Sequence, residues 1–151
     1  MIWSAEIPYF SRNELACKCG CGKLELDIRF AAALPALRLA WGGSLNLSSC
    51  CRCKTHNDKI PGHPRSLHLI DNPAHPCDGT MAADVAWRTW PTQTKLRFAR
   101  LAFSQGWSVG LHNGFCHIDR REDMNQAQAV FLYGKDWDEA TFAVTDVHTQ
   151  E

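Results

Sequence analysis

Apolar residues recur at helical spacing in two segments of the chain. Residues 27–41 carry them on two rows, and few charged residues interrupt either row. We therefore expect a buried helix there, with a kink at Pro35 and an end at Gly42. Residues 92–105 place their apolar residues on one face and are followed by Gly106, which predicts a second helix. The two rows of the first helix are Ile28, Ala31, Ala32 and Leu39, and Phe30, Leu34, Leu37 and Trp41.

Shorter apolar runs predict strands. Residues 44–48 alternate apolar and polar side chains, which is typical of a half-buried strand. Residues 81–86 form a short apolar run and predict a buried strand. Residues 107–111 and 115–118 flank the turn sequence His-Asn-Gly, which predicts an antiparallel hairpin.

The remaining segments complete the predicted fold. Ser11 and Glu14 have the spacing of a capping box and predict a short helix over 11–15. Residues 54–65 are polar and contain two prolines, so we expect an irregular loop there. Beyond Asp138 no element is predicted. The pattern predicts an α+β fold, in which a small, mostly antiparallel sheet is flanked by the two long helices.

Length and charge narrow the classes of function. The chain has 151 residues, and we expect a single domain over 1–151. Lys and Arg together number 16 and balance 16 Asp and Glu, so no long-range field recruits nucleic acid or an anionic membrane. The first ten residues lack the basic and apolar regions of a signal peptide. We expect a monomer that is made in the cytoplasm and uses neither nucleic acid nor a membrane as a partner.

Cysteine is frequent, and most of the eight cysteines fall in two clusters, at residues 17–21 and 50–53. Without a signal peptide, reduced thiols or a thiolate-bound metal are favoured over a disulfide framework. Disulfides would have to join the two clusters, because neighbouring cysteines do not easily pair. The candidates for a second, structural zinc site or for disulfides are Cys17, Cys19, Cys21, Cys50, Cys51 and Cys53.

Imidazole and carboxylate side chains recur near two predicted strands. His68 and Asp84 are separated by a connector that contains proline, and His117 lies in a later apolar run. Two histidines and an aspartate suit a catalytic zinc, which takes three protein ligands and leaves a position to water. Asp119 shares a strand face with His117 and is our prediction for the base. The competing interpretation is that each histidine is an ordinary core or surface residue.

The sequence from Ser49 to His68 resembles a known signature. It reads SCCRCKTHNDKIPGHPRSLH and is similar to the SGYRxxxHNxxVGGxxxSxH motif of the D-alanyl-D-alanine carboxypeptidase and L-alanyl-D-glutamate peptidase family. Members are zinc peptidases of bacterial cell walls and phage lysis enzymes, related in structure to the hedgehog signalling domain. The opening YFSRNELAC also resembles phage-type members, and the similarity spans roughly residues 9–121.

The resemblance implies roles for individual residues. The ligands of the family's catalytic Zn²⁺ correspond to His68, Asp84 and His117. Arg52 would bind a carboxylate of the substrate or stabilise the oxyanion in catalysis, because its planar guanidinium donates two parallel hydrogen bonds. Ser66 would contact the substrate or orient a ligand.

Three departures from the family pattern bear on the site. Residues 71–78 form an insertion between the first two ligands, and two cysteines replace the usual Gly-Tyr of the signature. Gly114 stands where many members place an acidic residue. His112 is therefore the second candidate for the base, after Asp119.

The resemblance implies zinc-dependent hydrolysis of a peptide bond in peptidoglycan stem peptides or cross-links. The enzyme would be an endolysin-like endopeptidase or a D-Ala-D-Ala carboxypeptidase. It would act on the bacterial cell wall, after release by a membrane-permeabilising partner of a bacteriophage. Two other classes stay open, a non-catalytic zinc-containing binding module of the same fold and a protein-interaction knuckle formed by the cysteines.

Overall fold

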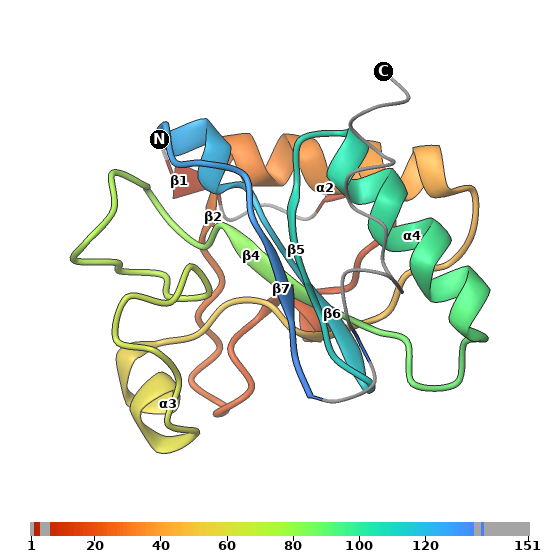
Figure 1. The fold of residues 1–151 in the computed structure, drawn as a ribbon. Coiled ribbons are helices and arrows are strands. Elements are labelled where there is room, and N and C mark those ends of the chain that lie inside the picture. Colours follow the sequence, from red (N-terminus) through yellow and green to blue (C-terminus); the bar gives the residue numbers. More distant parts are fainter. Residues whose placement is uncertain (1, 4–6, 135–136, 138–151) are drawn as a thin grey trace.

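A five-stranded sheet runs through the centre of the protein, shown in Figure 1 as a computed structural model that describes residues 2–3, 7–134 and 137. Neighbouring strands of this sheet are antiparallel except the last pair, β5 and β7, which is parallel. A smaller sheet pairs β1 (Ile2–Trp3) with β2 (Leu26–Asp27). The strands of the large sheet follow the order β3 (Leu47–Ser49), β4 (Ala82–Ala86), β6 (Phe115–Asp119), β5 (Ser108–Leu111) and β7 (Val130–Leu132).

Two long helices, α2 (Ile28–Trp41) and α4 (Thr92–Ser104), pack with this sheet and enclose the core (Figure 1). Side chains alternate between the two faces of a strand, so each strand contributes one set of residues to the core and the other to the opposite face. The core set includes Val85, Val109 and Ile118, all fully buried. Shorter helices lie in the connections, namely α1 (Arg12–Leu15), α3 (Lys54–Lys59) and the 3₁₀ helix η1 (Arg121–Met124). None of the helices in the described part of the chain has the length and apolar character needed to cross a membrane.

The predicted α+β fold with a mostly antiparallel sheet is confirmed. The hairpin forms between β5 and β6, and the buried strand and second long helix correspond to β4 and α4. The capping box of α1 is present in both directions, because Ser11 Oγ accepts from the Glu14 backbone and the Glu14 carboxylate accepts from the Ser11 backbone. The single domain over 1–151 stays a prediction, and the segment beyond Asp138 lies outside the described residues.

Other predictions were wrong in part. Only one face of α2 meets the core, so Ala31 is the one buried residue in the row of Ile28, whereas Ile28 and Leu39 are exposed by 47% and 68%. The predicted loop after Cys53 begins with α3, since Cys53 Sγ accepts a hydrogen bond from the His56 backbone and caps a helix within a polar sequence. Strand β3 begins at Leu47, three residues later than the predicted start. The short elements β7 and η1 were not predicted.

We expect the replacement of Asp27 by alanine to lower the free energy of unfolding by about 2 kcal/mol. Asp27 is the N-cap of α2, where its buried carboxylate accepts from the Arg29 backbone at 2.9 Å and from the Asp78 backbone at 3.0 Å. Arg29 Nη2 lies 3.0 Å from Asp27 Oδ2. Burial works against the charge, but these contacts keep the pKa of Asp27 below its usual value.

The sign of the pH dependence follows from that lowered pKa. The stabilisation by Asp27 is present above the unfolded pKa of about 4 and is lost as the pH falls through the lower folded pKa. Urea unfolding of the wild type and Asp27→Ala, followed by circular dichroism at pH 7 and at about pH 2.5, measures the difference and its loss in acid. Asp71→Ala is the control, because Asp71 is exposed. An Asp27→Ala protein as stable as this control at pH 7 would contradict the prediction.

Candidate metal centre

Strand register brings two of the predicted ligands together. Asp84 on β4 lies directly opposite His117 on β6, and residues paired in this way share a face of the sheet. His117 Nδ1 lies 3.4 Å from Asp84 Oδ1. His68, from the long segment between α3 and β4, brings its Nε2 to 3.2 Å from the same oxygen. All three side chains therefore converge on one point.

Contacts with the backbone fix the ring of His68. Its Nδ1 lies 2.7 Å from the carbonyl oxygen of Cys50, and a carbonyl only accepts, so Nδ1 carries the proton. The other ring nitrogen, Nε2, lies beside Asp84, where it donates to the carboxylate when the ring is protonated and can bind a metal ion when it is not. Ser66 Oγ accepts from the His68 backbone at 3.2 Å, and the Thr80 hydroxyl donates to the His68 carbonyl at 2.9 Å. These contacts hold an irregular segment in place at a buried ligand.

The far nitrogen of His117 is held by Asp119. Nε2 of His117 lies 2.7 Å from Oδ2 of Asp119, a fully buried carboxylate. Arg121 binds both oxygens of that carboxylate, with Nη2 at 2.7 Å from Oδ2 and Nε at 2.9 Å from Oδ1. Carboxylates of this kind orient the imidazoles that bind metals. Here the contact turns Nδ1 of His117 toward Asp84.

Burial and charge oppose each other at this cluster. Burial works against the carboxylate of Asp84, but the charges and hydrogen bonds of His68 and His117 keep the pKa of Asp84 well below its usual range. Burial likewise works against Asp119, whose pKa is held low by its hydrogen bonds with Arg121 and His117. Burial also disfavours the imidazolium of His117, yet its hydrogen bonds with Asp119 and Asp84 raise the pKa of His117 to about 9. A metal ion that binds His117 at neutral pH must therefore displace a proton.

The three side chains fit a zinc ion. Their ligand atoms, two imidazole nitrogens and a carboxylate oxygen, lie within 4.8 Å of one another. Zinc takes nitrogen and oxygen ligands at about 2.0–2.2 Å, and sites with three protein ligands leave a fourth position open. The other nitrogen of each histidine is already engaged, as expected for metal-binding imidazoles. The ligands lie in the wall of a cleft of about 800 Å³.

Comparison with protein families shows to which family the chain belongs. Residues 8–119, which include all three candidate ligands, match the family model described as Peptidase M15. This chain belongs to the peptidase M15 family. The resemblance carried by the signature at residues 49–68 is thereby confirmed, and the family consists of zinc peptidases. Neither a curated protein nor a solved structure matches this M15 chain.

Both residues predicted to bind the substrate lie at the cleft. Arg52 Nη2 lies 3.4 Å from Asp84 Oδ2, and its Nε donates to Ser49 Oγ at 3.2 Å. The guanidinium therefore lies beside the metal centre, and part of its hydrogen-bonding capacity is used within the protein. Ser66 accepts a hydrogen bond from the backbone of His68. Binding of substrate by Arg52 and Ser66 stays a prediction.

The two candidates for the base differ in their surroundings. Asp119 lines the cleft, but its two oxygens accept from His117 and Arg121. His112 also lines the cleft, where its ring stacks on Phe115 with centroids 4.5 Å apart. Its Nδ1 accepts from the Gly114 backbone at 3.0 Å, which leaves Nε2 outside that contact. Catalysis by Asp119 stays a prediction.

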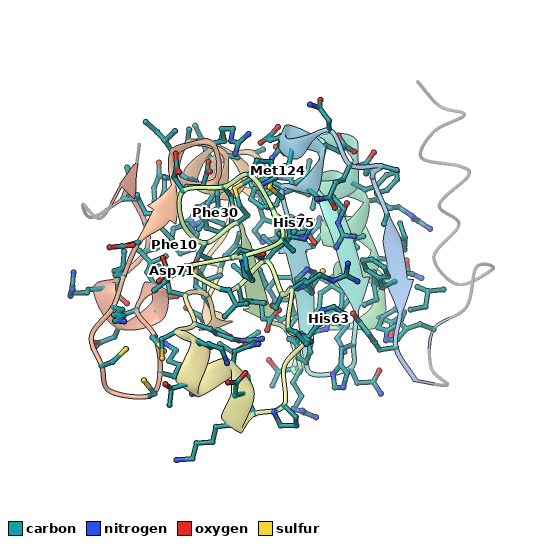
Figure 2. The ribbon with its side chains drawn as sticks, turned by 90° about the vertical axis from the view of Figure 1, so that its left-hand side faces the viewer. Phe10, Phe30, His63, Asp71, His75 and Met124 are labelled. Carbon is teal, nitrogen blue, oxygen red and sulfur yellow. The ribbon has the colours of Figure 1, made fainter. Side chains whose placement is uncertain are left out.

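The cleft contains residues that sequence reasoning missed. Tyr133 lies over Gly110, where any β-carbon would come within 2.9 Å of the tyrosine ring. The insertion between the first two ligands runs along the side of the protein viewed in Figure 2, where His75 is labelled. His75 lines the cleft, and its Nδ1 lies 2.7 Å from Gln126 Nε2. Glycine in a strand is the one sequence signal that pointed to a close approach, at Gly110.

The structure divides the six predicted cysteine candidates into two sets. Cys50 and Cys51 are fully buried in the hydrophobic core, and all the cysteines are free thiols. The other four gather their sulfur atoms within 4.8 Å of one another, in a group that shares no residue with the histidine centre. This second set, which we call the thiol cluster, consists of Cys17, Cys19, Cys21 and Cys53.

Proposed function

We propose that this M15 chain is a zinc peptidase that hydrolyses a peptide bond in peptidoglycan stem peptides or cross-links. The observation that carries the proposal is the convergence of His68, Asp84 and His117 at an open cleft within the region matched by the family. Cationic side chains, among them Arg52 and Arg65, also line the cleft. Arginine suits the free carboxylates of stem peptides, because it binds a carboxylate with two parallel hydrogen bonds.

Each residue near the centre has a role in the proposed reaction. A bound zinc ion would act as a Lewis acid toward the peptide carbonyl and would lower the pKa of water in its open position toward about 7. Arg52 lies beside the centre and would donate to the oxyanion that develops on the carbonyl. Asp119 positions His117, because its oxygens are engaged by His117 and Arg121. His112 would accept the proton of the attacking water and pass it to the leaving amine.

The place of action is part of the proposal. We infer that the protein reaches the bacterial wall after a partner permeabilises the membrane, as a phage endolysin does. The likeness of the opening sequence to phage-type M15 members supports this inference. Purified protein added to cells with a permeabilised outer membrane is then expected to lower their turbidity, whereas intact cells stay turbid.

Purified peptidoglycan provides the decisive substrate. The zinc-loaded protein is expected to release free amino groups, and mass spectrometry of the fragments identifies the bond. New N-terminal D-Glu would indicate cleavage after L-Ala, whereas free D-Ala would indicate carboxypeptidase activity. Absence of new amino groups, with the wall still bound in a pull-down, would overturn the proposal in favour of a binding module. The absence of an acid at Gly114 is the observation that favours that second candidate.

A further inference from the structure

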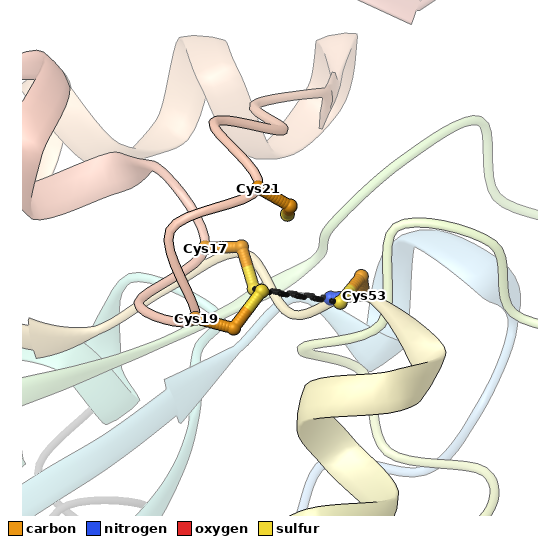
Figure 3. A group of neighbouring side chains, drawn as sticks. All are labelled: Cys17, Cys19, Cys21 and Cys53. Atoms are coloured by element: carbon orange, nitrogen blue, oxygen red, sulfur yellow. Dashed lines mark hydrogen bonds between the residues drawn. The ribbon is translucent and has the colours of Figure 1, made fainter.

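Four cysteine side chains meet at a point that the peptidase centre does not use. Cys17, Cys19 and Cys21 come from the loop after α1, and Cys53 directly precedes α3 (Figure 3). Cys17 is buried, Cys19 and Cys21 are exposed, and Cys53 is intermediate. Positive φ angles of 92° at Gly20 and 74° at Gly22 allow the loop to turn back on itself. The loop thereby presents its sulfur atoms toward Cys53.

The distances between the sulfur atoms fit a shared metal ion. Cys17 Sγ lies 3.5 Å from Cys19 Sγ and 3.7 Å from Cys53 Sγ, and Cys19 Sγ lies 3.6 Å from Cys53 Sγ. Zinc binds sulfur at about 2.3 Å, so a tetrahedral site separates its sulfur atoms by about 3.8 Å. A disulfide would require about 2.05 Å. The fourth sulfur atom, that of Cys21, lies within 4.8 Å of the others and completes the set.

Backbone N–H groups donate to two of the sulfur atoms. The Cys53 backbone nitrogen donates to Cys17 Sγ at 3.4 Å, and the His56 backbone nitrogen donates to Cys53 Sγ at 3.4 Å. Such N–H groups stabilise thiolates, which are the form that binds metal. The Cys51 backbone also donates to the Leu15 carbonyl at 3.0 Å, so the two chain segments are already aligned without a metal.

We propose that Cys17, Cys19, Cys21 and Cys53 bind a second, structural zinc ion. Four thiolates fill the tetrahedral coordination of zinc and leave no position for water or substrate, so this ion has no catalytic role. It cross-links the 17–23 loop to Cys53, which directly follows Arg52 in the chain. Because Arg52 contacts Asp84, the cross-link also steadies one wall of the peptidase cleft.

Metal analysis of purified variants tests the proposal. Protein prepared under reducing conditions with zinc and without chelators is expected to contain about two zinc ions per chain. The double substitution C19S/C21S should leave about one zinc ion, at the histidine centre. His68→Ala should also leave about one, at the thiol cluster. Cys77→Ser is the control and should keep both, since Cys77 lies outside the thiol cluster. Wild-type protein with one zinc ion that disappears in His68→Ala would overturn the proposal.

A second measurement does not require a variant of the cluster to fold. Cobalt substituted into the wild type is expected to give the intense near-ultraviolet absorption of thiolate-to-cobalt charge transfer, which nitrogen and oxygen ligands do not produce. The absorption should persist in His117→Ala, so this readout is independent of the peptidase proposal. Cobalt-loaded wild type without the absorption would overturn the inference. A disulfide between Cys17 and Cys53 in freshly reduced and zinc-treated protein, found by mass spectrometry, would also overturn it.

Discussion

Replacement of His117 by alanine is expected to lower kcat/KM by a thousand-fold or more and to remove the zinc ion held with His68 and Asp84. Two ligands cannot hold zinc against solvent, and the chemistry of the open position is lost with the ion. The expected loss of kcat/KM is on the order of a thousand-fold because a bound metal would supply both carbonyl polarisation and an ionised water at neutral pH. Asp84 would then remain buried with one histidine partner in place of two.

Zinc content and peptidoglycan hydrolysis of the same preparations measure both effects. His75→Ala is the matched control for zinc content, because His75 is another histidine that lines the same cleft but is not one of the three ligands. It should keep the zinc that His117→Ala loses. A wild-type level of zinc and of hydrolysis in His117→Ala would show that the metal is held elsewhere.

Two of the three ligands of the metal centre could be predicted from the sequence because they lie on predicted strands. Once 81–86 and the hairpin strands are recognised, alternation places Asp84 and His117 on the faces of their strands that point away from the core, and the observed register sets them opposite each other. His68 lies in no strand. Its place was predicted from the family signature, and the reason for that place is its hydrogen bond to the Cys50 carbonyl. That contact depends on tertiary packing.

The surroundings of the centre were harder to predict. The face that Asp119 shares with His117 was predictable from alternation, but Arg121 follows the end of β6, and its return to the carboxylate depends on the turn into η1. Position 114 illustrates the same limit, because a β-carbon there would meet the guanidinium of Arg88. An acid at that position would contact Arg88 in this structure.

The cysteines show how tertiary contacts select among equal candidates. Sequence spacing makes Cys50, Cys51 and Cys53 equally good candidates for metal binding. The pairing of the Cys51 backbone with Leu15 directs the first two side chains into the core and leaves Cys53 at the loop of the other cluster. No local pattern encodes this division, since the partners are separated by more than thirty residues.

Replacement of His112 by glutamine is expected to lower kcat on the order of a hundred-fold while the zinc content stays at the wild-type level. His112 lines the cleft without an ion-pair partner among the described contacts of its ring, so its loss removes a proton acceptor and leaves the ligands in place. His112→Phe retains the stacking on Phe115 and removes the ring nitrogens. It should be as impaired as His112→Gln if proton transfer is the cause.

Asp119→Asn separates the two candidates for the base. The carboxylate oxygens of Asp119 accept hydrogen bonds from His117 and Arg121. The asparagine variant should therefore bind zinc about 10–100-fold more weakly. Its kcat at saturating zinc should stay within about ten-fold of the wild type. Zinc titration and kcat measured on the same samples distinguish affinity from turnover. A hundred-fold loss of kcat in fully zinc-loaded Asp119→Asn, with His112→Gln unimpaired, would assign proton transfer to Asp119. The opposite pattern assigns it to His112, because a residue that only orients a ligand acts through the occupancy of the metal.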